Sequence, residues 1–212
     1  RDPESPREKR FQPAKIKTSA RAIRIKSAEK GARNKMLGNK ESIVVVYSGE
    51  QEAYNMKTKI AVLLHNIRST HNVGSIFRTS EGAGAEKIYF SGYTPTPIDR
   101  FGRAQKDIAK TALGAEKILS WEQKTSPFVI IEKLKKAGWE IVGVEQDKRA
   151  IDYRKFKTRK PTLFIFGNEV KGISPSLRKK CNTLIEIPMY GKKESLNVSV
   201  TAGIILFTVS SL

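Results

Sequence analysis

From residue 59 onward, short apolar runs alternate with longer stretches in which apolar residues recur every three or four positions. Short, nearly continuous apolar runs are typical of strands buried on both faces, whereas the longer periodic stretches are typical of helices packed on a sheet. The runs predict strands at 59–64, 87–92, 117–121, 139–146, 162–167 and 183–188. The periodic stretches predict helices at 73–84, 127–138 and 195–211. This alternation predicts an α/β fold, a mostly parallel sheet covered by helices on both faces.

Residues 1–55 follow neither pattern. They hold 13 Lys and Arg against 7 Asp and Glu, and they show little apolar periodicity before IVVVY at 43–47, which is compatible with one strand. Such composition favours a flexible basic arm. MKTKIAVLL at 56–64 is typical of a natural protein start, so we interpret 1–55 as an upstream extension and 56–212 as the folded domain.

Charge narrows the class of partner. The chain has a formal net charge of +19 and a pI near 10.1, and the excess of Lys and Arg persists in residues 56–212. Clustered cations release counterions from phosphates, so we expect a polyanionic partner such as RNA. A ribosome-like basic protein that only binds would have the same charge.

The remaining composition argues against several kinds of site. A single cysteine, Cys181, excludes an internal disulfide and a multi-cysteine zinc site, and two histidines do not supply the missing ligands. We therefore expect no metal. No apolar run is long enough to span a bilayer, so we expect no membrane partner and a reducing cytoplasmic location.

Ligands of parallel α/β sheets bind at the carboxyl ends of strands, so the loops after strands hold the candidate site. Three of these loops are rich in polar residues: HNIRSTHNVGSIFR at 65–78, GNEVKG at 167–172 and PMYGKKESLN at 188–197. Each has a simpler interpretation: Asn72 and either Ser195 or Asn197 are possible helix caps, and Glu169 could lie in a solvated turn. Three such loops together favour a site. GNEVKG lacks the spacing of a P-loop, and GAGAEK leaves a helix rather than a strand, so neither nucleotide motif fits.

Three segments resemble, in order and spacing, the motifs of the SpoU, or TrmH-like, RNA 2′-O-ribose methyltransferases of the SPOUT superfamily. They are NVGSIFRTSEGAG, FIFGNEVKGIS and IEIPMYGKKESLNVSVTAGIILF, and the resemblance covers about residues 59–211. It implies S-adenosylmethionine as cofactor, tRNA or rRNA as substrate, and a methyltransferase catalytic domain at 56–212. It also implies a C-terminal deep trefoil knot, an exception to the rule against threaded loops.

The resemblance assigns roles to individual residues. The adenosine site would be lined, mainly through backbone groups, by Gly167, Ile187, Met189 and Leu196, with Glu145 as a weaker candidate for the ribose hydroxyls. Gly167 suits this role because a residue without Cβ permits close approach of a ligand. The polar active-site positions correspond to Asn72, Arg78, Glu169, Ser195 and Asn197. Because guanidinium scarcely deprotonates, we expect Arg78 to bind a phosphate and stabilise the developing alkoxide, with another group accepting the proton.

Alternatives remain at this point. One is a non-catalytic RNA-binding protein of the same fold, and another is an RNA base methyltransferase from a different SPOUT branch. The final helix is apolar on more than one face, which favours a second packing surface over a helix wedged in one core. The family resemblance implies that this surface belongs to a homodimer. The arm either adds sequence-independent attraction to RNA or is inert.

Overall fold

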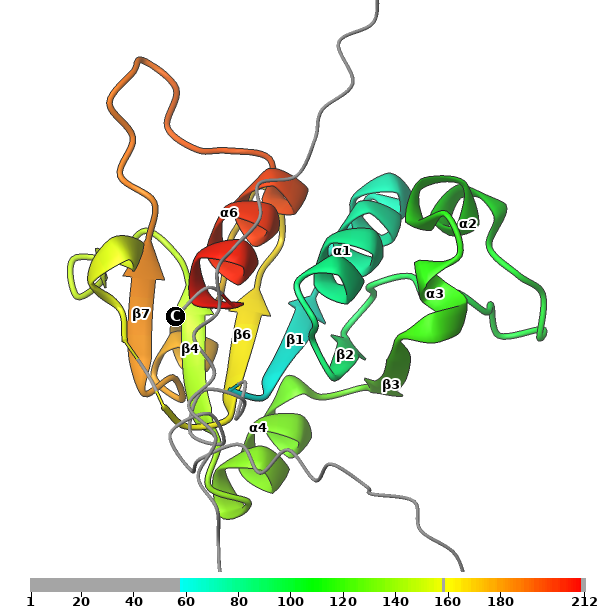
Figure 1. Ribbon diagram of the computed structural model, residues 1–212, viewed down its shortest axis with the longest axis horizontal. Coiled ribbons are helices and arrows are strands. Elements are labelled where there is room, and N and C mark those ends of the chain that lie inside the picture. The colour runs from blue at the N-terminus through cyan, green and yellow to red at the C-terminus, as the bar shows by residue number, and fades with distance from the viewer. Residues whose placement is uncertain (1–57, 158, 211–212) are drawn as a thin grey trace, which may run out of the picture. The chain divides into compact units, whose positions relative to one another are not determined.

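The computed structural model describes residues 58–157 and 159–210, which contain a seven-stranded sheet (Figure 1). Its strands are β1 (Ile60–His65), β2 (Lys87–Ser91), β3 (Ser120–Lys124), β4 (Glu140–Val144), β5 (Ile151–Asp152), β6 (Thr162–Phe166) and β7 (Thr183–Glu186). The strand order is β3-β2-β1-β6-β4-β7-β5, and all six pairings are parallel. The predicted α/β class and parallel sheet are confirmed.

Helices pack on both faces of this sheet. They are α1 (Thr70–Gly82), α2 (Lys106–Ala112), α3 (Ala115–Ile118), α4 (Pro127–Lys136), α5 (Pro175–Arg178) and α6 (Val198–Ser210), with a 3₁₀ turn, η2, at Tyr153–Lys155. Alternate residues of a strand point to opposite faces, so β1 sends Val62 and Leu64 into one core and Leu63 into the other. The first core includes α1 and α6, which lie side by side in Figure 1, and the second includes α4 and α5.

One predicted strand is misplaced. KILSW at 117–121 was expected to be extended, but its first two residues end α3 and β3 begins at Ser120. The reason is the position of β3 at the edge of the sheet, where an apolar run is not required: Ile118 is 72% exposed, whereas Leu119 is buried. The final helix also begins later than predicted, at Val198.

Several short elements had no sequence signal: α2, α5 and the two-residue strand β5. The possible strand at 43–47, the basic arm and the boundary at residue 55 lie outside the described residues. In the described part of the chain, no helix combines the length and apolar character that crossing a membrane requires.

Candidate functional site

The amino-terminal end of α1 is built around the carboxylate of Glu169. Glu169 accepts hydrogen bonds from the backbone N–H of Arg68 (3.0 Å) and of Ser69 (3.1 Å), and from the side-chain amide of Asn72 (3.1 Å). Ser69 is the N-cap, since its hydroxyl accepts from the backbone N–H of Asn72 at 3.2 Å. The interpretation of Asn72 as an ordinary cap is therefore wrong, and its side chain is available for other contacts.

These donors keep Glu169 ionised. Partial burial raises the pKa of this carboxyl group, but the N–H groups of Arg68 and Ser69 and the amide of Asn72 outweigh burial and lower the pKa below its usual value. The free N–H groups at a helix start also favour a negative charge. A carboxylate stabilised in this way is a poor proton acceptor, so Glu169 is better suited to positioning Asn72 than to general-base catalysis.

A second polar link joins α1 to α6. The amide of Asn197 donates to the side-chain oxygen of Asn72 at 3.2 Å. The side-chain oxygen of Asn197 accepts from the backbone N–H of Ser199 (2.8 Å), which makes Asn197 the cap of α6. Glu169, Asn72 and Asn197 thus form one chain of hydrogen bonds that joins the loop after β6, the first turn of α1 and the segment before α6. Ser195 is not needed as a cap. It is exposed, and its hydroxyl has no hydrogen-bond partner within the described residues.

Arg78 lies apart from this chain of hydrogen bonds. It is exposed on α1, almost two turns beyond Asn72, and it forms no hydrogen bond or ion pair with the described part of the protein. The structure therefore brings together Asn72, Glu169 and Asn197 of the predicted catalytic set, whereas Arg78 is not among their partners.

A cavity of about 290 Å³ opens beside these residues, at the carboxyl ends of β4, β6 and β7. All five predicted cofactor residues line it, as do two of the predicted catalytic set: Gly167, Ile187, Met189, Leu196, Glu145, Glu169 and Ser195. Asn72, Arg78 and Asn197 lie outside its lining. The cavity therefore collects residues from the second and third motifs.

The lining of the cavity is acidic. Among the residues that the structure describes, the lining includes four glutamates, Glu145, Glu169, Glu186 and Glu194, and no Lys, Arg or His. Such a lining repels a nucleotide polyphosphate and attracts a cation. Gln146 was not predicted as a site residue, but it also lines the cavity, and its amide donates to the backbone oxygen of Glu194 at 2.7 Å. Its place at the end of the predicted strand at 139–146 was the available signal.

Two glycines shape the floor of the cavity. A Cβ on Gly167 would lie 2.4 Å from the backbone carbon of Gly172 and 2.6 Å from the nitrogen of Ile173. The expectation was that Gly167 admits a ligand, but in the structure its missing side chain makes room for the protein backbone. Gly172 has φ +62°, and a Cβ there would lie 2.1 Å from a carboxylate oxygen of Glu145.

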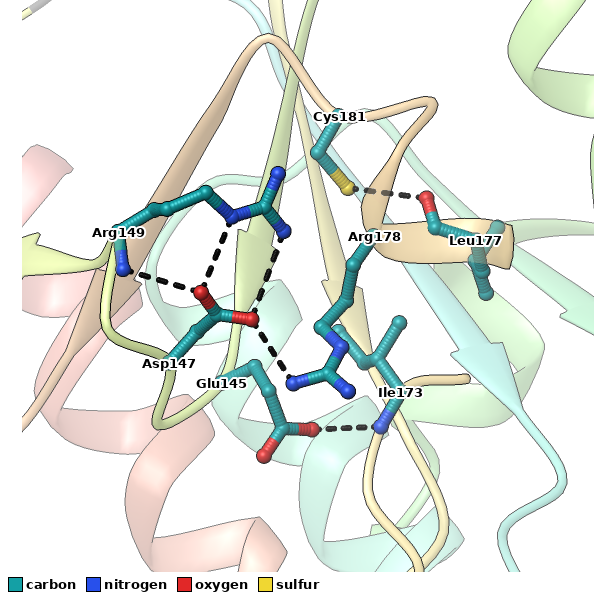
Figure 2. A network of polar contacts seen from close by, with 7 residues as sticks. All are labelled: Glu145, Asp147, Arg149, Ile173, Leu177, Arg178 and Cys181. Carbon is teal, nitrogen blue, oxygen red and sulfur yellow. Dashed lines mark hydrogen bonds and ion pairs between the residues drawn. The ribbon is translucent and has the colours of Figure 1, made fainter. Parts of the chain in front are cut away.

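Glu145 holds this backbone in place (Figure 2). One of its oxygens accepts from the N–H of Ile173. The other has no hydrogen-bond partner in the described residues, so it is free to accept from a ligand hydroxyl. Glu145 therefore anchors the loop between β6 and α5, a role that its position in the sequence did not reveal.

Figure 2 shows a second anchor of the same loop. Asp147 accepts from the guanidinium of Arg149 at 3.1 Å and from that of Arg178, in α5, at 2.9 Å. The hydrogen bonds from Arg149, first its side chain and then its backbone N–H, lower the pKa of Asp147 to about 2, with Arg178 adding to the effect. The carboxyl end of β4 thus holds both ends of the segment from Ile173 to Arg178.

Comparison with known proteins identifies the family of this chain. Residues 59–207 match the model of the SpoU rRNA Methylase family. The chain is 31% identical over 148 residues to the tRNA (guanosine(18)-2′-O)-methyltransferase of Aquifex aeolicus, an alignment that covers 70% of this chain and 67% of that protein. It is also 31% identical to the 23S rRNA (guanosine-2′-O-)-methyltransferase RlmB of Pseudomonas syringae pv. tomato, with 70% of this chain and 56% of that protein covered.

Solved structures show the same fold. The AdoMet-bound rRNA methyltransferase of Sinorhizobium meliloti superimposes with a TM-score of 0.67 at 26% identity, covering 74% of this chain and 57% of that one. The TrmH/SpoU tRNA modifying enzyme of A. aeolicus superimposes with a TM-score of 0.64 at 29% identity, covering 73% and 76%. The chain spans little more than half the length of several curated relatives that it matches. The prediction from the three motifs is confirmed: this chain belongs to the SpoU rRNA methylase family.

Proposed function

We propose that this protein transfers the methyl group of S-adenosylmethionine to a ribose 2′-hydroxyl of tRNA or rRNA. The observation that supports this most strongly is the acidic cavity, which lies beside the Glu169–Asn72–Asn197 chain of hydrogen bonds. Within the described part of the chain, its lining has four glutamates and no basic residue. A sulfonium cofactor carries positive charge, so this lining fits it and disfavours polyphosphate cofactors.

The residues present fit the cofactor. Gly167, Ile187, Met189 and Leu196 line one cavity and offer backbone and apolar contacts for adenosine, and the free oxygen of Glu145 is placed to accept from a ribose hydroxyl. When bound, the sulfonium supplies an already activated methyl group. The protein then has to align the acceptor oxygen and to favour the negative charge that develops on it.

Four side chains are assigned to that task. The exposed hydroxyl of Ser195 lines the cavity with no hydrogen-bond partner in the described residues, so it can bind the acceptor ribose. Asn72 and Asn197 hold the loops of the site in register through their hydrogen bond. Arg78 binds an RNA phosphate and stabilises the incipient alkoxide. For this role, the RNA or a second subunit must lie close to both Arg78 and the Glu169–Asn72–Asn197 chain of hydrogen bonds.

A homodimer would supply such a second subunit. One side of α6 packs into the core through Ile205 and Leu206, while Val200 and Phe207 on the same helix are each 50% exposed. Exposed apolar side chains on a helix favour a second surface of association. We propose that α6 forms part of a dimer interface, next to α1 and Arg78. We also propose the trefoil knot in the C-terminal part and a cytoplasmic location, both implied by the family.

The test is methylation of bulk RNA. The full chain is incubated with radiolabelled S-adenosylmethionine and with tRNA or rRNA, and the RNA is then digested to nucleosides. We expect label in 2′-O-methylated nucleosides, because the acceptor is the ribose oxygen. Label only in methylated bases would favour the other SPOUT branch, and RNA binding without label would favour the non-catalytic alternative. Arg78→Ala is the control, and we expect it to lose turnover but to retain cofactor binding.

A further inference from the structure

A basic depression adjoins the acidic cavity across the loop that carries Glu169. It is lined by Arg68, Tyr93, Asn168, Val170 and Lys171. Asn168 and Val170 line the cavity as well, so the two hollows share one wall. The charge reverses across this wall, from the carboxylates of the cavity to the cations of the depression.

Within the described residues, the two cations of the depression have no anionic partner. Arg68 and Lys171 are both exposed, and neither takes part in an ion pair with any residue between 58 and 210 that the structure describes. The backbone N–H of Arg68 binds Glu169, but its guanidinium is not part of that contact. Unpaired cations next to an active site are suited to phosphate oxygens.

Tyr93 adds an aromatic face that is fixed in place. The side chain is 60% exposed, although its hydroxyl accepts from the amide of Asn168 at 3.0 Å. Its backbone N–H also donates to the side chain of Asn66 at 3.3 Å. Asn168 is itself buried and donates to the backbone oxygen of Asn66 at 3.0 Å. An exposed ring that is held at both ends is a ready platform for stacking an unpaired base.

We infer that this depression binds the RNA nucleotide next to the one that is methylated. Arg68 and Lys171 take its phosphates, and the ring of Tyr93 stacks on its base. The inference rests on the proposed function, because it takes RNA as the substrate and the acidic cavity as the cofactor site. It gives the loop at 167–172 a role on each side: Glu169 faces the cofactor cavity and Lys171 faces the RNA.

The first experiment tests the cations. The double variant Arg68→Gln, Lys171→Gln is compared with Lys135→Gln, Lys136→Gln. The second pair removes two exposed cations of α4 that form no ion pair with the described residues, and α4 packs on the face of the sheet opposite to α1. Binding of the full chain to a fluorescent 12-nucleotide single-stranded RNA is measured by anisotropy between low and high salt. For a single strand, each phosphate contact contributes about 0.7 to the slope of the logarithm of the binding constant against the logarithm of the salt concentration. Losing two contacts should therefore reduce this slope by about 1.4 and weaken binding roughly 25-fold near 0.1 M salt.

The second experiment tests the aromatic ring. Tyr93→Ala should weaken binding of the same RNA by roughly 5- to 150-fold, the range for loss of one stacked base. It should have little effect on an oligomer of equal charge whose residues are abasic. Tyr93→Phe loses the bond to Asn168 but keeps the ring, so it should bind the normal RNA nearly as well as the unsubstituted protein.

The outcomes separate this inference from the proposed function. Equal losses in the two double variants, or equal effects of Tyr93→Ala on normal and abasic RNA, would overturn the inference even if the protein methylates ribose. Conversely, an unsubstituted protein that methylates no RNA, but whose variants show the expected pattern, would refute the proposed function and leave the RNA subsite standing. Binding of S-adenosylmethionine should be unchanged in every variant. If the Tyr93 variant does not fold, the pair of double variants decides.

Discussion

Adding one methyl group at Gly167 should disrupt the acidic cavity. In Gly167→Ala the new Cβ would lie 2.4 Å from the backbone carbon of Gly172, 2.5 Å from its oxygen and 2.6 Å from the nitrogen of Ile173. Favourable contacts between carbon atoms lie near 3.5–4.0 Å, so the two backbone segments would have to separate by about 1 Å. No side-chain rotation relieves the clash, because all three atoms belong to the backbone.

The cost follows from what holds Ile173. Overpacking of a well-packed site costs about 1–3 kcal/mol. Moving Ile173 also stretches its hydrogen bond to the carboxylate of Glu145, and bonds to charged groups contribute roughly 1.5–3 kcal/mol. We therefore expect the free energy of unfolding to fall by about 3 kcal/mol, which lowers Tm by roughly 6–12 °C for a domain of this size. Binding of S-adenosylmethionine should weaken at least tenfold, because both segments form the cavity floor.

A matched substitution separates this clash from a general effect of Gly→Ala. Gly203 lies in α6, and a Cβ there would meet only the methyl group of Thr79, at 3.8 Å. Since Ala is the better helix former, Gly203→Ala should raise stability by up to about 1 kcal/mol. Urea denaturation measures both variants, and calorimetry measures cofactor binding. A Gly167→Ala protein with the stability and cofactor affinity of the unsubstituted chain would show that Gly172 does not lie against Gly167.

Three further predictions follow from the same region. Asn197→Ala should lower the free energy of unfolding, measured by urea denaturation, by about 1 kcal/mol, because it removes the cap of α6. Ser195→Ala should instead impair methyl transfer with little change in stability. The pKa of Asp147 is lowered to about 2 in the folded protein, so its contribution to stability is present above pH 4 and is lost as the pH falls toward 2. The free energy of unfolding of Asp147→Asn should therefore fall less steeply between pH 4 and pH 2 than that of the unsubstituted protein. Burial raises the pKa of Cys181 to about 11, so a thiol reagent at pH 8 should label the folded protein far more slowly than the protein in urea; equal rates would contradict the burial of this thiol.

Strands buried on both faces were the most predictable part of the fold. β1 and β6 are apolar runs because residues on both of their faces enter a core, so periodicity alone located them. β3 was misplaced because an edge strand can be polar, as its sequence SWEQK is. The helix α2 was missed since it buries only Ile108 and Ala112, too few positions for a helical period to be visible.

The site was predictable as a set of loops but not as a set of contacts. Parallel strands place their carboxyl ends at one edge, which is why the loops after β1, β6 and β7 meet. Nothing in the sequence tells which of Ser195 and Asn197 caps α6, because both side chains can accept from a helix N–H. The partner of Asn197 is Asn72, 125 residues away, and a contact of that range depends on the packing of α1 against α6.

The local charge of the site differs from the charge of the whole chain, and this difference has a physical use. A protein with a net charge of +19 attracts RNA over its surface, yet its cofactor must be a cation if the proposed function holds. A uniformly basic surface would repel a sulfonium, and a uniformly acidic site would repel the phosphates next to the acceptor ribose. The loop at 167–172 resolves this conflict over a few residues. It presents Glu169 to the cavity and Lys171 to the depression, while the buried amide of Asn168 fixes the backbone between them by accepting from the N–H groups of Val170 and Lys171. Two substrates of opposite charge can therefore approach one reaction centre from its two sides.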